Sequence, residues 1–327
     1  MIRTAVLVAL ACALCACTGK YKRATTEEKI EATPARLARG DYLVNQLSGC
    51  GGCHTSRETG RLLVESERAD RFLAGGNILP DNEARIFIPN ITPDQETGIG
   101  AWTDDEVMRA IRDGIHRDGH ILLPMMPSNQ YQHYSEEDIR SVVAYLRTVP
   151  AQKQPRPTAE HVIPFFPKFL FTTVGVALHP PATKVPEPDK KNPAAYGLYV
   201  ARIAACNDCH SLTKKGPRKE DDPLFMAGSE GPFSDPELGK VWARNLTPDP
   251  ETGLGKYTAE QIKQAIRTGT RLDGHKMAPP MAIMMGHYSG IADEDLDALI
   301  GWLRSLKPVK NAIPPRELVA AMQAAYP

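Results

Sequence analysis

Two five-residue stretches decide how this sequence folds: Cys50-Gly51-Gly52-Cys53-His54 and Cys206-Asn207-Asp208-Cys209-His210. Both follow the pattern Cys-x-x-Cys-His. A longer repeat follows each of them, because residues 90–126 align without a gap with residues 245–281, and about half of these positions are identical. A solenoid would repeat at a much shorter period of about 20–50 residues. The sequence therefore predicts two tandem homologous domains.

The repeated pentapeptide is the attachment signature of c-type haem. In such a site the two thiols add to the vinyl groups of the porphyrin, and the histidine binds the iron. One helical turn brings all three side chains to the same porphyrin edge. We therefore predict four thioether cysteines and two iron-binding histidines: Cys50, Cys53, Cys206, Cys209, His54 and His210.

Three other interpretations of the motif are weaker. A structural zinc site needs four ligands, and neither motif has a further Cys or His nearby at zinc-finger spacing. A thioredoxin-like dithiol needs a βαβ context, which the surrounding sequence lacks. A disulfide within one helical turn is sterically poor and leaves the repeated histidine unexplained.

The repeat also indicates a sixth ligand for each iron. Met126 aligns with Met281, and each precedes the predicted last helix of its domain. A thioether opposite histidine raises the reduction potential of haem iron. Other residues stay open: Met125, Met284 and Met285 are fallback ligands or core fillers, and the aligned His120 and His275 are a bis-histidine alternative. We expect the unmatched histidines on the surface: His116, His133, His161 and His287.

Helix signals recur in both repeats. Thr103 and Thr258 open capping boxes before apolar residues at helical spacing. Further helices are predicted near 34–47, 193–205, after Ser135 and from Asp293. Convincing strand alternation is absent, so we predict all-α domains with long Gly/Pro-rich loops. The expected organisation is a signal segment (1–17), a flexible tether (18–33), a first domain (34–150), a proline-rich linker (151–190), a second domain (191–312) and a tail (313–327).

Composition excludes two classes of protein. The 39 Lys+Arg balance 39 Asp+Glu, which argues against nucleic-acid binding driven by bulk positive charge. A mean hydropathy of −0.33 argues against a polytopic membrane protein. Aromatic residues make up only 6% of the 327 residues, and two buried porphyrins would supply the missing apolar volume.

The first residues are typical of an export signal. A short positive start, Met1-Ile2-Arg3, precedes an apolar run to Ala16 that is too short to span a bilayer as a stable helix. Leu14-Cys15-Ala16-Cys17 is similar to a bacterial lipobox and predicts a lipid anchor on Cys17. An ordinary secretory cleavage near Ala16 is the alternative. Both predict an exported, periplasmic protein, which the lipid would attach to a bacterial membrane.

With these motifs in place, the chain from about Leu37 to Val309 resembles the bacterial di-haem cytochrome c family of tandem class I cytochrome c domains. The resemblance rests on the two pentapeptides, the repeated Asn-(Ile/Leu)-Thr-Pro-Asp-x-Glu-Thr-Gly segment and the Met-containing loops. It implies that the Met before the last helix is an axial ligand. Met281 departs mildly from the family pattern, because Ala282 follows it where proline is frequent.

The loops that contain Asn90 and Asn245 would lie at the haem edge in such a fold. Together with Trp102 and Tyr257, these residues could donate hydrogen bonds to the haem propionates. Ordinary turn chemistry explains the asparagines equally well.

The predicted function is electron transfer through two His/Met-ligated haems, with no small-molecule substrate and no nucleic acid. The resemblance implies redox protein partners: a periplasmic or membrane dehydrogenase on one side and an oxidase or another cytochrome on the other. The alternative is a di-haem redox enzyme, peroxidase-like or thiosulfate-dehydrogenase-like, which would need an open or displaceable iron ligand. The linker carries an apolar stretch, Phe165–Phe171, which we expect to pack against the domains; a membrane or partner contact is the alternative.

Overall fold

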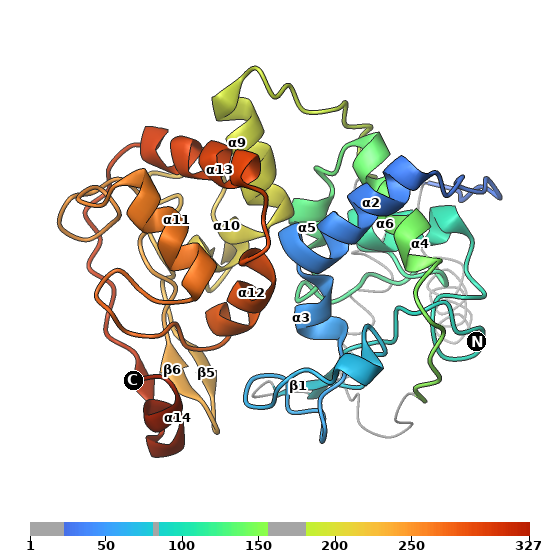
Figure 1. Ribbon diagram of the computed structural model, residues 1–327, viewed down its shortest axis with the longest axis horizontal. Coiled ribbons are helices and arrows are strands. Elements are labelled where there is room, and N and C mark those ends of the chain that lie inside the picture. Colours follow the sequence, from blue (N-terminus) through green and yellow to red (C-terminus); the bar gives the residue numbers. More distant parts are fainter. Residues whose placement is uncertain (1–22, 81–84, 156–180) are drawn as a thin grey trace, which may run out of the picture.

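The computed structural model describes residues 23–80, 85–155 and 181–327 and divides into two similar halves (Figure 1). The predictions for residues 1–22 and for Phe165–Phe171 lie outside these ranges. The first half contains α2 (Pro34–Tyr42), the π-helix η1 (Leu43–Leu47), α3 (Cys50–His54), the 3-10 helix η2 (Ala69–Arg71), β1 (Ile78–Pro80), β2 (Arg85–Phe87), α4 (Asp104–Arg112), α5 (Ser128–Tyr131) and α6 (Glu136–Leu146). The second half contains α9 (Pro193–Ile203), α10 (Cys206–His210), β3 (Leu212–Thr213), β4 (Gly216–Pro217), β5 (Phe233–Asp235), β6 (Gly239–Val241), α11 (Ala259–Thr268), α12 (Met281–Tyr288), α13 (Asp293–Ser305), β7 (Glu317–Leu318) and α14 (Ala320–Ala325).

The all-α prediction is only partly correct, because short strands occur between the helices. Strand β1 pairs with β2 and β3 with β4, and β5, β6 and β7 form a three-stranded antiparallel sheet. Each strand has only two or three residues. The period-2 alternation that reveals a strand in sequence needs about four to eight residues, so these strands were not detectable from the sequence.

The predicted helix starts are confirmed. The side chains of Thr103 and Thr258 each accept a hydrogen bond from the backbone N–H three residues later. In return, the side chains of Glu106 and Gln261 accept a hydrogen bond from the backbone N–H of the capping threonine. These reciprocal bonds satisfy two backbone donors that would otherwise lack a partner. Ser135 caps α6 in the same way through the N–H of Asp138.

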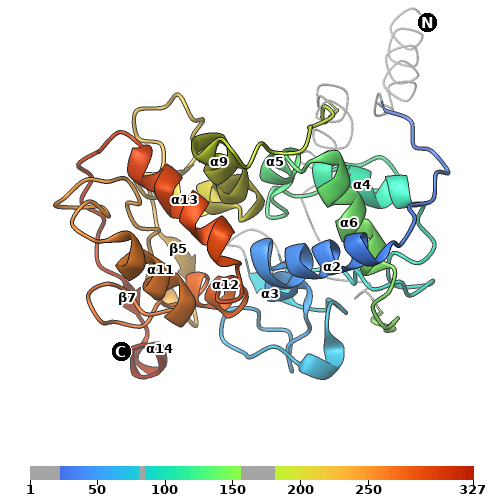
Figure 2. The ribbon, with the colours of Figure 1, turned by 45° about the horizontal axis from the view of Figure 1, so that its top comes forward.

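In each half, the first helix crosses the last helix at a glycine (Figure 2). A Cβ atom at Gly40 would lie 2.1 Å from the carbonyl oxygen of Ser141, and one at Gly197 would lie 2.2 Å from that of Ala298. Only glycine permits this approach of α2 to α6 and of α9 to α13.

The π-helix η1 accommodates one extra residue in the first half. Ten positions lead from Gly40 to Cys50, and nine lead from the equivalent Gly197 to Cys206. Both the glycine crossing and the Cys-x-x-Cys-His helix are preserved, so the extra residue widens one turn between them. Such single-turn π-bulges are a common way for a helix to absorb an insertion.

The two halves are joined by reciprocal hydrogen bonds between a tyrosine and a buried aspartate. Tyr42 donates to Asp295 at 2.6 Å and accepts from the N–H of Ala292, while Tyr199 donates to Asp138 at 2.5 Å and accepts from the N–H of Ser135. Each tyrosine therefore bonds to the first turn of the other half's last helix. The repeated chain thus forms a pseudo-two-fold interface.

His287 is not a surface residue, contrary to the prediction. His287 is part of α12 in the second half. Its side chain packs against the first half and is only 11% exposed. Its Nδ1 is 2.9 Å from the carbonyl oxygen of Asn45, and its Nε2 is 3.1 Å from Oε1 of Glu67. A Cβ at Gly51 would lie 2.9 Å from its ring. The repeat could not reveal this contact, because His287 has no counterpart in the first half.

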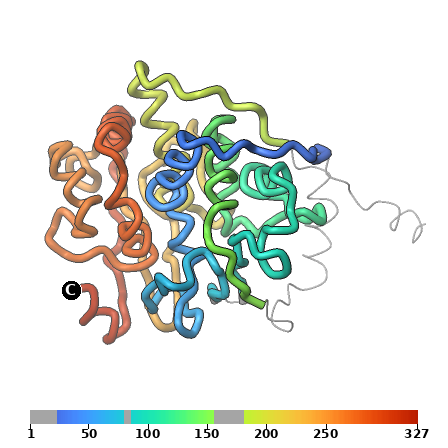
Figure 3. The backbone as a smooth tube through the Cα atoms, turned by 45° about the vertical axis from the view of Figure 1, so that its right-hand side comes forward, coloured from blue at the N-terminus to red at the C-terminus, as the bar shows by residue number. Residues whose placement is uncertain are grey.

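The described part of the tether is bonded to the first half (Figure 3). Arg23 forms ion pairs with Asp105 and Asp113, and the N–H of Ile30 donates to Asp104. Residues 23–30 of the expected tether therefore form ion pairs and hydrogen bonds with α4 and with Asp113, which follows it. None of the helices in the described ranges is long and apolar enough to cross a membrane.

Candidate functional site

Each Cys-x-x-Cys-His motif forms a short helix that begins after a residue with left-handed backbone. Gly49 precedes α3 with φ of 56°, and Ala205 precedes α10 with φ of 50°. Such a conformation disfavours residues that carry a Cβ, so its recurrence at a non-glycine residue indicates that the surrounding fold enforces it. The turn directs both motifs toward the centre of the molecule.

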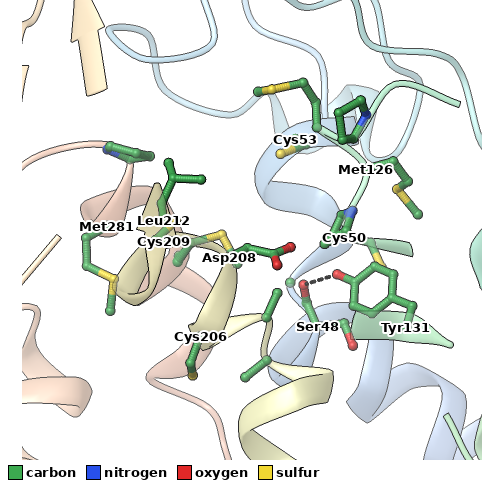
Figure 4. A pocket seen from close by; sticks show the side chains of 18 of the residues that line it. Ser48, Cys50, Cys53, Met126, Tyr131, Cys206, Asp208, Cys209, Leu212 and Met281 are labelled. Atoms are coloured by element: carbon green, nitrogen blue, oxygen red, sulfur yellow. Dashed lines mark hydrogen bonds between the residues drawn. The ribbon is translucent and has the colours of Figure 1, made fainter. Parts of the chain in front are cut away.

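All four cysteine side chains line one continuous cavity (Figure 4). Its volume is about 2040 Å³, whereas pockets for a single small ligand rarely exceed about 1,000 Å³. No disulfide joins these four cysteines. Burial raises the pKa of Cys50 and Cys206 to about 12. The cavity has room for two large apolar cofactors within reach of the thiols.

The two histidines are oriented for coordination. His54 Nδ1 lies 2.9 Å from the carbonyl oxygen of Pro89, and His210 Nδ1 lies 2.7 Å from that of Arg244. A carbonyl only accepts, so Nδ1 carries the proton and Nε2 is the free base. Burial lowers the pKa of both imidazoles and favours this neutral form. An imidazole held in this way by its other nitrogen is the usual arrangement of a metal-ligating histidine.

A hydrogen bond from a second loop holds the backbone of each histidine. The N–H of Gly75 donates to the carbonyl of His54 at 2.6 Å, and the N–H of Gly228 donates to that of His210 at 2.8 Å. Leu73 and Met226, two residues earlier in each loop, both adopt positive φ. The matching Phe-x-Ala-Gly segments of the repeat therefore form equivalent supports.

Met126 and Met281 both line the cavity, and Figure 4 shows them on opposite sides of it with the four cysteines between them. The neighbouring Met125, Met284 and Met285 line the same cavity and differ in their burial. Met125 is 46% exposed. Met284 extends toward Gly49 of the other half, and Met285 is buried in the core. All five methionines reach the cavity, so the choice of Met126 and Met281 as the sixth ligands rests on their alignment in the repeat.

The two histidines of the bis-histidine alternative are placed differently. His120 lines the cavity, with Nδ1 2.5 Å from Asp118, whereas His275 does not line it and its side chain is 57% exposed beside Asp273. Asn90 and Asn245 also have another role. Their amide groups bond to Thr97 and Thr252 in their own turns and to the backbone after the last helix. Turn chemistry therefore accounts for the amide bonds of both asparagines, and Asn90, Asn245, Trp102 and Tyr257 all line the cavity.

The motif analysis missed several residues that surround the site. Tyr131 and Tyr288 donate to the carbonyls of Ser48 and Ala204, each two residues before the first cysteine of a motif. Asp208, inside the second motif, accepts bonds from Asn129 and Gln130 of the first half at 2.8 and 2.9 Å. Burial raises the pKa of Asp208. The tyrosines lie at different offsets in the two halves, so the gapless repeat could not pair them.

Comparison with known proteins agrees with this geometry. Residues 37–150 and 194–307 each match the family description of cytochrome c. The chain belongs to the cytochrome c family. It is similar to the fructose dehydrogenase cytochrome subunit of Gluconobacter japonicus (29% identity; 88% of this chain and 56% of the relative) and to the gluconate 2-dehydrogenase cytochrome c subunit of Pantoea cypripedii (27%; 84% and 60%). It is also similar to a diheme cytochrome c-type protein of Cereibacter sphaeroides (26%; 80% and 83%).

This cytochrome c carries two haem c groups and transfers electrons. Two family matches, a di-haem relative and a cavity of sufficient size all agree on the cofactor. The relatives are cytochrome subunits rather than catalytic subunits, so the enzymatic alternative is not favoured. The chain spans a little over half the length of the first two dehydrogenase-associated relatives.

Proposed function

We propose that this cytochrome accepts electrons from a dehydrogenase and passes them through both haems to an oxidase or another cytochrome. The observation that carries the proposal is the shared cavity, because the side chains of Cys53 and Cys209 from different halves line the same space. When bound, each haem supplies a one-electron Fe(III)/Fe(II) couple. Two such couples in one cavity provide a continuous route across the molecule.

The residues proposed for the first site are Cys50, Cys53, His54 and Met126, and those for the second are Cys206, Cys209, His210 and Met281. The cysteines would hold the cofactor through thioethers, and each His/Met pair would ligate its iron. With both ligands in place, neither iron would bind a substrate. Met125, Met284 and Met285 remain the fallback ligands.

Electron transfer without catalysis has a direct test. We expect potentiometric titration of the purified holoprotein to give two one-electron steps per chain, both with low-spin spectra. The ferrous protein should not bind carbon monoxide rapidly. Rapid carbon monoxide binding at either iron would instead show an open coordination position and would support an enzymatic role.

The dehydrogenase partner is proposed from the printed names of the relatives, which are cytochrome subunits of fructose, gluconate and alcohol dehydrogenases. Co-purification from the native host, followed by mass spectrometry, tests this association. A flavin- or quinone-dependent dehydrogenase that reduces the purified cytochrome would support it. Recovery of the cytochrome alone, with no reduction by dehydrogenase-containing membranes, would contradict it.

We further propose export to the periplasm and a lipid anchor on Cys17. At least two acyl chains would be needed, because one chain gives only marginal membrane attachment. We expect labelled palmitate to be incorporated into the wild-type chain and not into Cys17→Ser. The Cys17→Ser protein should also leave the membrane fraction. Membrane attachment unchanged in Cys17→Ser would disprove the anchor.

A further inference from the structure

The C-terminal segment is built into the second half of the molecule. Its strand β7 pairs with β6, with Leu318 opposite Gly239. Leu318 and Met322 are buried in a cluster that also contains Leu62 and Leu63 of the first half. The segment from Ile313 to Pro327, which we call the C-terminal tail, therefore packs on both halves.

The tail places Arg316 at the wall of the haem cavity. Its Nη1 donates to the carbonyl of Lys276 at 2.6 Å, and its Nη2 donates to that of Tyr326 at 2.5 Å. The N–H of Lys276 in turn donates to the carbonyl of Pro327. Arg316 is thus fixed between the tail and the loop that leads to Met281, and no carboxylate forms an ion pair with it among the described residues.

Two more arginines line the cavity beside it. Arg244 donates to the carbonyls of Ile313 and Pro314 in the tail, at 3.0 and 2.9 Å. Arg271 pairs with Asp273 at 2.5 Å. Burial and repulsion from Arg271 lower the pKa of both Arg244 and Arg316.

The balance of charge at this wall is positive. One carboxylate, Asp273, interacts with all three guanidinium groups. It pairs with Arg271, and its charge raises the pKa of Arg244 and Arg316 against the effects that lower them. The other cavity-lining carboxylate of this half, Asp208, is bonded to Asn129 and Gln130 instead. Three partly buried guanidinium groups share one neighbouring carboxylate, so the wall carries a net positive charge and favours an anion in the cavity.

The first half lacks this arrangement. In the gapless repeat, His116 of the first half aligns with Arg271 of the second. At the position just before the repeat begins, the first half has Pro89 and the second half has Arg244. Pro89 and Arg244 are structurally equivalent, because their carbonyls accept the bonds from His54 and His210. Arginine at these two positions is therefore confined to the second half, and the cavity-lining arginines of the first half, Arg23, Arg109 and Arg117, lie at other positions.

We propose that the C-terminal tail completes the second haem site, with Arg316, Arg244 and Arg271 binding the carboxylate groups of that haem. The inference rests on the proposed haem sites and adds residues to the second one. A fixed cation near the iron stabilises the reduced state, whose charge is less positive. The cluster therefore raises the potential of the second haem relative to a site without it.

The test is redox titration of Arg316→Gln and of Arg244→Gln/Arg316→Gln holoprotein. A unit charge about 12 Å from the redox centre, in a partly buried site, changes the one-electron equilibrium constant about tenfold. A tenfold change corresponds to about 59 mV for a one-electron couple. We expect the reduction potential of one of the two steps to fall by about this amount. It should be the step that Met281→Ala also moves, and the other step should stay unchanged.

Two controls separate charge from folding. Arg316→Lys keeps the charge and should restore most of the potential. Arg304→Gln removes an exposed arginine of α13 that also donates to a carbonyl, that of Tyr257, but does not line the cavity. It should leave both steps unchanged.

Three outcomes would overturn the inference: neither step moves in the double variant, both steps move equally, or added phosphate shifts the wild-type step as much as the substitutions do. The last would show that the cluster binds a solution anion. Failure of the proposed function would appear differently, as the absence of two one-electron, low-spin steps in the wild-type protein.

Discussion

The hydroxyl group of Tyr42 donates a 2.6 Å hydrogen bond to Asp295 in the opposite half of the molecule. Tyr199 makes the equivalent bond to Asp138 in the reverse direction. Because α3 and α10 follow the helices that carry these tyrosines, the pair of bonds fixes the relative positions of the two Cys-x-x-Cys-His motifs. The interface thus sets the separation of the two motifs and, through them, would set the distance between the haems.

Replacing Tyr42 with Phe should destabilise the protein by about 1 kcal/mol, because the buried Asp295 loses one hydrogen-bond donor and keeps that of Tyr196 in its own half. Denaturant unfolding of the holoprotein measures the loss. Tyr145→Phe is the matched control, since its hydroxyl bonds to Asn45 within the first half and should change stability less. The combined Tyr42→Phe/Tyr199→Phe variant should split unfolding into two transitions, and a single unshifted transition would argue against this interface.

Replacing Gly40 with Ala should cost about 3 kcal/mol or more, because the added Cβ would overlap the carbonyl oxygen of Ser141 and force α2 away from α6. Gly301→Ala provides the opposite case. Nothing lies within 4 Å of a Cβ at Gly301 in α13, so alanine should stabilise the helix by about 0.5–1 kcal/mol. Thermal unfolding distinguishes the two, and equal effects would contradict the described helix crossings.

Stability should depend on pH through His287. Burial opposes its charged form, but the hydrogen bond and charge of Glu67 outweigh burial, so its pKa is raised above 6.5. A raised folded-state pKa gives a contribution that is complete below about pH 6.5. It is lost as pH rises through the folded-state value.

Unfolding free energy measured from pH 6 to pH 9 should therefore decline more steeply in the wild type than in His287→Gln. Glutamine does not titrate but can still bond to Asn45 or Glu67. Parallel curves for the two proteins would show that the His287–Glu67 contact contributes nothing that depends on pH.

Replacing Cys209 with Ser should remove one thioether from the second site and leave the first unchanged. Mass spectrometry of peptides that contain each motif, after digestion of the holoprotein, gives the result directly. Cys53→Ser is the matched variant for the first site. Loss of both haems in either variant would show that the two sites do not mature independently.

The sequence predicted the parts of the molecule that the repeat contains twice. The motifs, the capping boxes at Thr103 and Thr258 and the alignment of Met126 with Met281 all have two copies, so each supports the other. Features with one copy were missed or misjudged, such as His287 in the interface and Arg316 in the tail. Their positions depend on contacts between distant segments, and such contacts have no local pattern. The short strands were too brief to show alternation.

The central claim is that each iron has a His/Met ligand pair, with Met126 at the first haem and Met281 at the second. The most direct measurement is the weak far-red absorption band of Met-ligated ferric haem, recorded for the wild type, Met126→Ala and Met281→Ala. We predict that each single substitution removes about half of the band, lowers the potential of one haem only, and opens one iron to carbon monoxide. A band that keeps its full intensity in either variant would contradict the assignment and identify a neighbouring methionine or a histidine as the ligand.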